Sequence, residues 1–367
     1  MRTMLPLLLI LTSCNGEQVK ASLPVGTQNL KFETLLQGED VIWGFDFLPD
    51  GKVILTERIG KMLVFDPKLK TTTVVKGVPK VYNAGQAGLL DVRTHPDFLK
   101  NNTIYFTYSE PIGENQSTTA LGTAILKNNE LVNFKKLFSG HGPNSNDIHY
   151  GSRIEFDSSG HLFISMGDRD ERNKAQDLSF HQGKILRFNL DGSIPQDNPF
   201  KAAADKKPEI WSFGHRNPQG LTRHPETGEL WEAEMGPRGG DEVNLISAQK
   251  NYGWPQVTFG KEYWGPKIGQ TEKPGIQQPV VYWVPSISPS AITFYTGDKF
   301  PDWKNNLFIA ALSGNHVHRV VLNKQKVEKQ EELLSELEYR WRSIRTGPDG
   351  YLYAGTDEGR FGRIIKE

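Results

Sequence analysis

The sequence predicts an all-β fold, a six-bladed β-propeller of four-stranded antiparallel blades, and two observations carry this prediction. The first is an imperfect repeat in which a turn rich in Pro, Asp, Gly or Asn precedes a short strand of alternating apolar residues. The second is the near absence of helical periodicity. The six turns begin at Pro49, Pro96, Asp157, Pro225, Pro301 and Pro348. Each interval has room for the three or four short strands of one blade.

Residues 324–337 are the one stretch with faint helical periodicity, and their charges fit a long hairpin equally well. A β-sandwich would also use many short strands. Six similar turn-and-strand units at blade spacing favour the propeller over the sandwich.

The chain begins with the features of a bacterial lipoprotein signal peptide, which we expect to span residues 1–13. Arg2 supplies a positive charge, and the apolar run from Met4 to Leu11 is too short to cross a bilayer. The run ends in LTSC, which resembles a lipobox, so Cys14 is predicted to become the lipidated N-terminus. The alternative is an ordinary signal peptide with an incidental cysteine.

Export follows from this prediction, with residues 14–28 as the lipidated end and a polar tether before a propeller of residues 29–367. Cys14 is the only cysteine of the chain, which suits an oxidising compartment where free thiols are liabilities. Asn15 stands where an Asp would signal retention at the inner membrane. We therefore expect a periplasmic lipoprotein or one anchored to the outer membrane or cell surface.

The composition excludes several classes of partner. Lys plus Arg and Asp plus Glu number 43 each, so the chain has no net field that would attract nucleic acid or an anionic membrane. Contact with a membrane is therefore expected only through a lipid anchor. With 37% hydrophobic and 10% aromatic residues, the chain can bury a large core and is not disordered.

A propeller gathers small-ligand sites at the axial ends of its inner strands, where polar loop residues converge. The motif DIHYGSR leads into the third repeat and offers His149 as a general base near neutral pH. Asp168 ends the third repeat, and Gln86 lies in the loop that enters the second. A histidine by itself is more often a structural hydrogen-bonding residue, so the motif gains its weight from the other loops.

Two arginine motifs indicate an anionic ligand. GHRNPQG places Arg216 and Asn217 in a turn before a strand, where an arginine offers a fixed fork of donors to a carboxylate or quinone oxygen. Arg340 and Arg342 are two residues apart, so on a strand they face the same side and suit a ligand with two or three negative charges. A surface turn and a solvated strand edge are the respective alternatives.

The segment EMGPRGGDEVN has the composition of a calcium site. Gly236 and Pro237 expose consecutive carbonyls, and Asp241 and Glu242 add hard oxygen ligands. A glycine-rich acidic turn is weak evidence for calcium when it stands alone.

These separated loops together resemble the soluble pyrroloquinoline-quinone-dependent sugar dehydrogenases, and most closely their compact aldose sugar dehydrogenase branch, of the glucose/sorbosone dehydrogenase family. The resemblance runs from about residue 29 to the end. The matching stretches are GQAGLLDV, HYGSR, MGDRDERN, QGKILRFNLDGSIPQDNPF, EIWSFGHRNPQGL, GPRGGDEVN, KNYGWP and RTGPDGYLY. The resemblance implies an enzyme that oxidises the anomeric carbon of aldose sugars to lactones and passes the electrons to an external acceptor.

The resemblance also implies roles for individual residues. His149 matches the base that takes the hydroxyl proton while hydride passes to the quinone, and Asp168 matches the residue that supports this base. Arg216 matches the arginine at the quinone oxygens, with Asn217 beside it. Stabilising charge that develops on those oxygens follows the logic of an oxyanion hole.

The remaining matches concern the cofactor and calcium. Gln86, Arg340 and Arg342 match residues that hold pyrroloquinoline quinone. The residues matching calcium ligands fall at two sites, with Gly236 and Pro237 beneath the cofactor and Asp241, Glu242 and Tyr252 at a structural site.

The chain also departs from the family's glucose dehydrogenase branch. Where that branch has a cofactor-binding lysine, this chain reads SAITFYTGD, so either Tyr295 or Thr296 substitutes or the contact is missing. The long inserts of that branch are absent, which implies an open site, broad aldose specificity and a monomer, with a dimer as the alternative. Trp264 and Trp283 are candidates for the wall of the sugar pocket.

Two other functions stay open on the sequence. A calcium-dependent lactonase propeller would use a central cation but would need no quinone, and the pair Arg340 and Arg342 argues against it. A catalytically inactive propeller that binds sugars or proteins is the second alternative, and the presence of both His149 and Arg216 argues against it.

Overall fold

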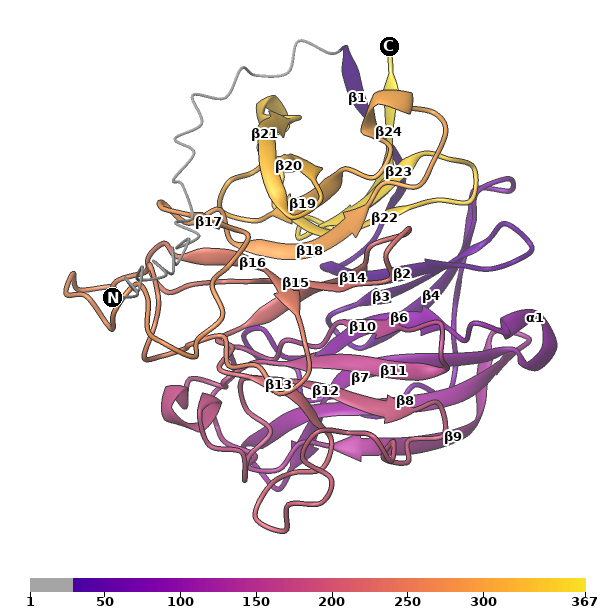
Figure 1. Cartoon of the computed structure of the whole chain (residues 1–367). Helices are drawn as coiled ribbons and strands as arrows, with labels where there is room; N and C mark the ends of the chain where they lie inside the picture. The colour runs from indigo at the N-terminus through magenta and orange to yellow at the C-terminus, as the bar shows by residue number, and fades with distance from the viewer. Residues whose placement is uncertain (1–28) are drawn as a thin grey trace, which may run out of the picture.

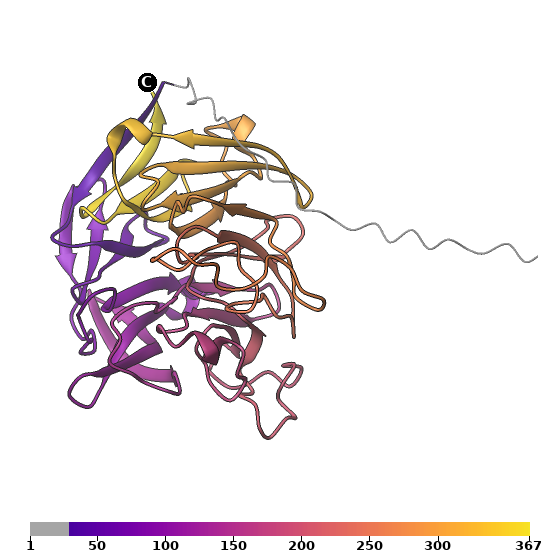
Figure 2. The same cartoon turned by 90° about the vertical axis from the view of Figure 1, so that its left-hand side faces the viewer.

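A computed structural model describes residues 29–367, which form six four-stranded antiparallel sheets arranged around a common axis (Figure 1; Figure 2). The predicted six-bladed propeller is therefore confirmed. The predicted signal peptide, Cys14 and the tether lie outside the described residues. Within residues 29–367, no helix has the length and apolar character needed to span a bilayer.

The blades follow one another in chain order, and each begins with its innermost strand. Blades one to three contain β2 (Ile42–Phe47), β3 (Val53–Glu57), β4 (Lys61–Asp66), β5 (Thr71–Val74), β6 (Leu89–Thr94), β7 (Thr103–Ile112), β8 (Gln116–Lys127), β9 (Glu130–Ser139), β10 (Ile154–Phe156), β11 (His161–Met166), β12 (Lys184–Asn189) and β13 (Ile210–Phe213).

Blades four to six complete the ring. They contain β14 (Pro218–Arg223), β15 (Leu230–Glu234), β16 (Asp241–Ile246), β17 (Val281–Trp283), β18 (Pro289–Phe294), β19 (Leu307–Ala311), β20 (Val317–Asn323), β21 (Lys326–Leu333), β22 (Trp341–Thr346), β23 (Leu352–Thr356) and β24 (Arg360–Lys366). The helical pieces are short: α1 (Phe98–Asn101), η1 (Arg172–Ala175), η2 (Pro301–Trp303) and η3 (Ser335–Leu337). The segment 324–337 is mostly the second strand of the β20–β21 hairpin, so the hairpin alternative is correct.

The ring closes through strands from the two ends of the described chain. β1 (Leu30–Gln37) pairs antiparallel with β24, so the sixth blade has the strand order β1-β24-β23-β22. The pairing begins with Leu30 opposite Lys366. Figure 1 shows β1 beside β24 near the C-terminus. The last blade is complete only when both ends of the chain are in place.

The hydrophobic cores lie between neighbouring blades, because each sheet buries apolar side chains on both faces. One cluster joins the fourth and fifth blades, where Trp231 of β15 meets Phe294 of β18 edge-on, with ring centroids 5.6 Å apart. Another joins the first and second blades and includes Ile54, Met62 and Phe106. Packing of this kind fixes each blade against the next one around the ring.

One buried side chain, Arg153, joins the innermost strands at the axis. It directly precedes β10, and its guanidinium donates hydrogen bonds to the backbone carbonyls of Trp43, Gln219, Ser290 and Arg342 at 2.7–2.8 Å. It also lies 3.3 Å from the carboxylate of Asp91, whose other oxygen accepts from the backbone N–H of Ile154 at 3.0 Å.

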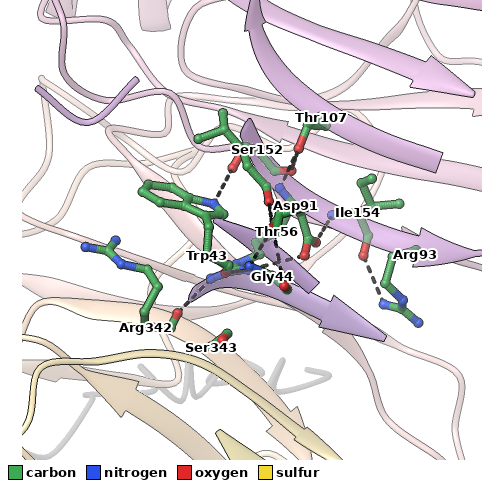
Figure 3. A network of polar contacts seen from close by, with 12 residues as sticks. Trp43, Gly44, Thr56, Asp91, Arg93, Thr107, Ser152, Ile154, Arg342 and Ser343 are labelled. Carbon is green, nitrogen blue, oxygen red and sulfur yellow. Dashed lines mark hydrogen bonds and ion pairs between the residues drawn. The ribbon is translucent and has the colours of Figure 1, made fainter. Parts of the chain in front are cut away.

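These acceptors lie on β2, β6, β14, β18 and β22. Arg153 therefore contacts the innermost strand of each of the five other blades. Part of the network is drawn in Figure 3, where Trp43, Asp91, Ile154 and Arg342 are labelled. Burial lowers the pKa of Arg153 to about 10, and Asp91 opposes this change, so the side chain stays charged at neutral pH. A buried charge is tolerated when hydrogen bonds and an ion pair compensate its lost hydration.

We predict that Arg153→Met lowers the free energy of unfolding by about 3–5 kcal/mol, because it leaves Asp91 charged and buried without its partner. Urea unfolding followed by tryptophan fluorescence measures the change. Arg363→Met is the matched control, because its pairs with Glu33 and Asp349 lie at the partly exposed outer edge of a blade. Such pairs contribute about 0–1 kcal/mol. Equal stability of the two variants would contradict the assignment of Arg153 as the axial contact.

Candidate functional site

The predicted site residues gather at one end of the propeller, where all six innermost strands begin. Gln86, His149, Arg216, Asn217 and Arg340 precede inner strands, and Arg342 is the second residue of β22. Asp168 follows β11, and Gly236 and Pro237 follow β15. β11 and β15 are the second strands of their blades and run antiparallel to the innermost strands. Their last residues therefore reach the end of the propeller at which the innermost strands begin. The structure thus brings together residues that lie far apart in sequence.

His149 is held in a fixed orientation at this end. Its Nδ1 lies 2.7 Å from Oδ1 of Asp168, and its backbone N–H donates to Oε1 of Gln86 at 2.9 Å. Its φ of 55° is in the left-handed region. Gly167 allows the close approach, because a Cβ there would lie 2.2 Å from the carbonyl oxygen of His149. Nε2 makes no hydrogen bond within residues 29–367, so this nitrogen is available to a ligand.

Asp168 is buried and acts as the anion behind His149. Its Oδ2 accepts from Nε1 of Trp254 at 2.7 Å, and its Oδ1 also accepts from the backbone N–H of Asp170 at 2.9 Å. Burial by itself would raise the pKa of Asp168, but the hydrogen bond and charge of His149, with the charge of Arg216, lower it below the ordinary value. A charged Asp168 fixes the imidazole with a proton on Nδ1 and a lone pair on Nε2.

Arg216 lies next to this pair. The backbone N–H of Asp168 donates to the carbonyl of Arg216 at 2.7 Å. The guanidinium of Arg216 donates to the carbonyls of Met235 and Gly236 at 3.0 and 2.8 Å. Asn217 is fully buried, and its Oδ1 accepts from the backbone N–H of Gly151 at 3.2 Å. Its side chain therefore fastens the loop that carries His149.

The two predicted anion-binding arginines share one carboxylate that the sequence did not reveal, that of Asp357. Arg342 donates from Nε and Nη2 to Asp357 at 2.7 and 3.1 Å, and Arg340 donates from Nε at 3.0 Å. The prediction that both arginines face one side is confirmed. Burial would raise the pKa of Asp357, and the charges of Arg342 and Arg340 instead lower it.

The two arginines differ in exposure. The Arg340 side chain is 48% exposed, whereas that of Arg342 is 9% exposed and stacks 4.5 Å from the ring centre of Trp43. Arg340 can therefore meet a ligand at the surface, and Arg342 lies deeper, near the axis. Asp357 could have been found from its position in the TDEG motif. This motif directly follows β23 and therefore lies beside the start of β22.

A group of buried acids lies next to Arg216, on β15 and β16. Glu234 is the cross-strand neighbour of Glu242, and Glu232 is the neighbour of Asn244. The amide of Asn244 donates to all three carboxylates at 3.2–3.4 Å. Burial and the charge of Glu234 raise the pKa values of Glu232 and Glu242 well above the ordinary value. Glu232 and Glu234 were not predicted from the sequence, although acids two residues apart on a strand point to one face.

A small cavity adjoins these acids, with a volume of about 10 Å³ and Glu234, Gly236, Glu242 and Tyr252 in its lining. This volume holds one water-sized group. The carboxylates and carbonyls here are the hard oxygen donors that calcium prefers. The residues present therefore fit a calcium ion.

Asp241 and Tyr252, two other predicted calcium ligands, make contacts within the protein. Asp241 accepts four hydrogen bonds, from the backbone N–H groups of Gly236, Ile287 and Ser288 and from the hydroxyl of Ser286, at 2.7–2.9 Å. Its carboxylate thus holds the loop around Gly236 and Pro237. The Tyr252 ring stacks on His215 at 4.7 Å.

The structure excludes Tyr295 and Thr296 as substitutes for a cofactor lysine, which leaves the other alternative, that this contact is missing. Both residues follow the last residue of β18, so they lie at the opposite end of the propeller from His149. The Tyr295 hydroxyl is buried and donates to the carbonyl of Gly350 at 2.5 Å. At the His149 end, the fifth blade presents the loop 312–315, in which the carbonyl of Leu312 lies 3.5 Å from Nη1 of Arg340.

The two tryptophans proposed for a sugar pocket differ in position. Trp264 is 75% exposed in the long segment between β16 and β17, which an ion pair between Glu262 and Arg172 joins to η1 near Asp168. Trp283 donates from Nε1 to Gln330 of β21 at 3.0 Å, so its indole points toward the fifth blade. Its placement in a sugar pocket stays a prediction.

The chain is similar to a known family over most of its length. Residues 39–366 match the family model described as glucose/sorbosone dehydrogenase. Aldose sugar dehydrogenase YliI of Escherichia coli is 40% identical over 340 residues, which cover 91% of each chain. The apo crystal structure of the soluble E. coli aldose sugar dehydrogenase superposes with a TM-score of 0.89 at 39% identity, covering 92% of this chain and 100% of that one.

A third similar protein was solved with its cofactor. The PQQ-bound aldose sugar dehydrogenase of Streptomyces coelicolor superposes with a TM-score of 0.78 at 25% identity, and the match covers 94% of this chain and 100% of that one.

We predict that Asp168→Asn lowers the free energy of unfolding at neutral pH by about 1.5–3 kcal/mol, because a charged hydrogen-bond acceptor is lost. The folded pKa of Asp168 is below the ordinary 3.8. Its stabilisation is therefore present above that value and lost as the pH falls through the folded pKa. Urea denaturation at several pH values should show that the difference in the free energy of unfolding between wild type and variant becomes smaller in acid. Asp205→Asn, at an exposed position, is the control and should cause little change at any pH. A gap independent of pH would contradict the prediction.

Proposed function

The chain belongs to the glucose/sorbosone dehydrogenase family, and on that premise we propose that it is an aldose sugar dehydrogenase dependent on pyrroloquinoline quinone. The proposed reaction oxidises the anomeric carbon of an aldose to the lactone, and an external acceptor takes the electrons. The single observation that carries the proposal is the oriented His149–Asp168 pair among three arginines at one end of the axis. A base and cationic anion-binding groups are the parts that this chemistry needs from the protein.

The arginines suit the charges of the cofactor. Arg340 and Arg342 are placed by Asp357 with their guanidinium groups side by side, and such groups bind carboxylates in a fixed geometry. Arg216 and Gln86 lie nearer to His149 and would contact the quinone end. When bound, pyrroloquinoline quinone supplies the two-electron acceptor for the hydride of the anomeric carbon.

His149 performs the proton transfer in this proposal. Its Nδ1 is engaged by Asp168, so the lone pair of Nε2 accepts the proton of the anomeric hydroxyl. Asp168 then stabilises the positive charge that forms on the imidazole. Gln86 fixes the backbone of His149, so the ring keeps its position during the transfer.

We propose that calcium is held where Glu234, Gly236 and Glu242 line the small cavity beside Arg216, with Pro237 next to Gly236 in the chain. The high pKa values of the neighbouring acids support this proposal, because a divalent cation would compensate their mutual repulsion. When bound, calcium supplies positive charge next to the cofactor. Asp241 supports the site by holding its loop.

The proposal extends to the state of the protein in the cell. The LTSC motif supports an exported lipoprotein attached to a membrane through Cys14 and located in the periplasm or at the outer membrane or cell surface. The short loops support a monomer with broad aldose specificity. A calcium-dependent lactonase would not need two arginines placed by one carboxylate, and an inactive binding protein would not need an oriented His149.

We predict that the purified chain reduces a redox dye when it is given pyrroloquinoline quinone, calcium and an aldose. His149→Ala should lower kcat by about 10²–10⁴-fold or more, because the general base is lost. Cofactor affinity, measured by fluorescence titration, should change little. Arg342→Gln should instead weaken cofactor binding, because a buried contact to a carboxylate is lost.

His141→Ala is the control for the histidine variant, because His141 is exposed and should have no effect. Absence of dye reduction with every aldose, together with an unchanged quinone spectrum, would contradict the proposed function. Loss of cofactor binding in His149→Ala would contradict the role of His149 as a base.

We predict that calcium raises the Tm more strongly as the pH increases from about 5 to about 8. The pKa values of Glu232 and Glu242 are raised well above the ordinary 4.5. Without calcium, their contribution to stability is fully present below pH 4.5 and is lost as the pH rises through the folded pKa. Calcium compensates the carboxylate charges in place of the lost protons, so the rise in Tm that it causes becomes larger as the pH increases.

Glu242→Gln should remove most of this calcium-dependent shift, whereas Glu272→Gln, at an exposed position, should leave it unchanged. Scanning fluorimetry in chelator and in calcium measures both. A calcium effect that is the same at all pH values would contradict the proposed ligands.

A further inference from the structure

The fifth blade contains a second group of metal-ligating side chains, away from the acids of β15 and β16. His316 comes just before β20, His318 lies on β20, and Glu332 lies directly opposite His318 on β21. Their ligand atoms all lie within 4.8 Å of one another. His316 and His318 are two residues apart in an extended segment, so their side chains share one face of the sheet. Both imidazoles are buried, at 2% and 1% exposure.

The outer nitrogen of each imidazole meets a carbonyl oxygen. Nδ1 of His316 lies 2.7 Å from the backbone carbonyl of Gly314, and Nε2 of His318 lies 2.9 Å from Oε1 of Gln330. The indole N–H of Trp283 donates to the same Oε1 at 3.0 Å, which identifies that atom as the oxygen of the amide. Both contacts therefore require a proton on the outer nitrogen.

The inner nitrogens then face each other without a proton. Nε2 of His316 and Nδ1 of His318 are 3.0 Å apart. A neutral imidazole has one N–H, and in each ring the outer nitrogen uses it, so two lone pairs point at each other. A cation between the nitrogens would satisfy both lone pairs.

We propose that His316, His318 and Glu332 form a binding site for a divalent transition metal ion, with Zn²⁺ as the best match. Two nitrogens bound at about 2.0–2.1 Å around a tetrahedral ion lie about 3.3–3.4 Å apart, close to the observed separation. Histidine ligands in proteins characteristically donate their other N–H to a carbonyl or carboxylate, as both imidazoles do here. Glu331 pairs with Arg319 and Lys329, whereas Glu332 has no such ion pair within residues 29–367 and supplies the negative ligand.

The site has a structural role in this proposal. The metal joins β20 and β21 to the loop 312–315, because Gly314 of that loop accepts the hydrogen bond of His316. The same loop contacts Arg340 through the carbonyl of Leu312. Metal binding would thus fix a segment beside the candidate cofactor site. The inference does not depend on the proposed enzymatic activity.

The test titrates the chelator-treated full chain with Zn²⁺ by calorimetry, and with Co²⁺ as an optical probe, in excess calcium to occupy the acids of β15 and β16. We expect one equivalent of Zn²⁺ to bind, and Co²⁺ to give the visible absorption of a four-coordinate site. His318→Gln should weaken Zn²⁺ binding by about 100-fold or more, with loss of the Co²⁺ band. His141→Gln, at an exposed histidine, should retain both.

Glu332→Gln covers the case in which His318→Gln fails to fold, because Glu332 is only half-buried. It should weaken Zn²⁺ binding by about 10–100-fold while circular dichroism stays unchanged. Equal Zn²⁺ affinity in the wild type and in the folded ligand variants would overturn the proposal. Failure of the wild type to bind either metal would also overturn it, and a shared proton would then join the two imidazoles.

Discussion

The structure depends on one buried cation. Arg153 binds carbonyls or a carboxylate from the innermost strands of the other five blades, so a single guanidinium defines how the inner strands meet. An apolar plug could fill the same space, but it would leave these carbonyls without partners. Arg153 lies four residues after His149 in one loop, and its acceptor Arg342 also belongs to the candidate site. The axis contact and the site are therefore parts of one rigid arrangement.

The end of the propeller separates charge into two zones. Arg340 and Arg342 form a cationic rim that Asp357 holds in place. Buried acids on β15 and β16 form an acidic zone beside Arg216. His149 lies at the same end of the propeller, with Asp168 behind it. The cationic rim and the acidic zone are therefore separate places, on the sixth and fourth blades respectively, at the end that carries His149.

Much of the fold and part of the site could be predicted from the sequence. Turn chemistry marks each blade locally, and His149, Arg216 and Arg342 lie in contiguous motifs before inner strands. Asp357, Glu232 and Glu234 were missed, because their roles depend on which strands become neighbours. The exclusion of Tyr295 from the candidate site has a similar cause. Tyr295 follows an inner strand, whereas the site residues precede such strands or follow second strands, so strand direction places it at the far end.

The pairing of β1 with β24 has a consequence for how the molecule folds. Leu30 and Lys366 become partners although nearly the whole described chain separates them. Contacts of such long sequence separation form slowly, because the entropy of loop closure must be overcome first. Five blades can assemble during synthesis, but the sixth must wait until the last residues leave the ribosome. Until then the inner face of the unfinished ring stays exposed, and such a surface makes an incompletely folded chain prone to aggregation.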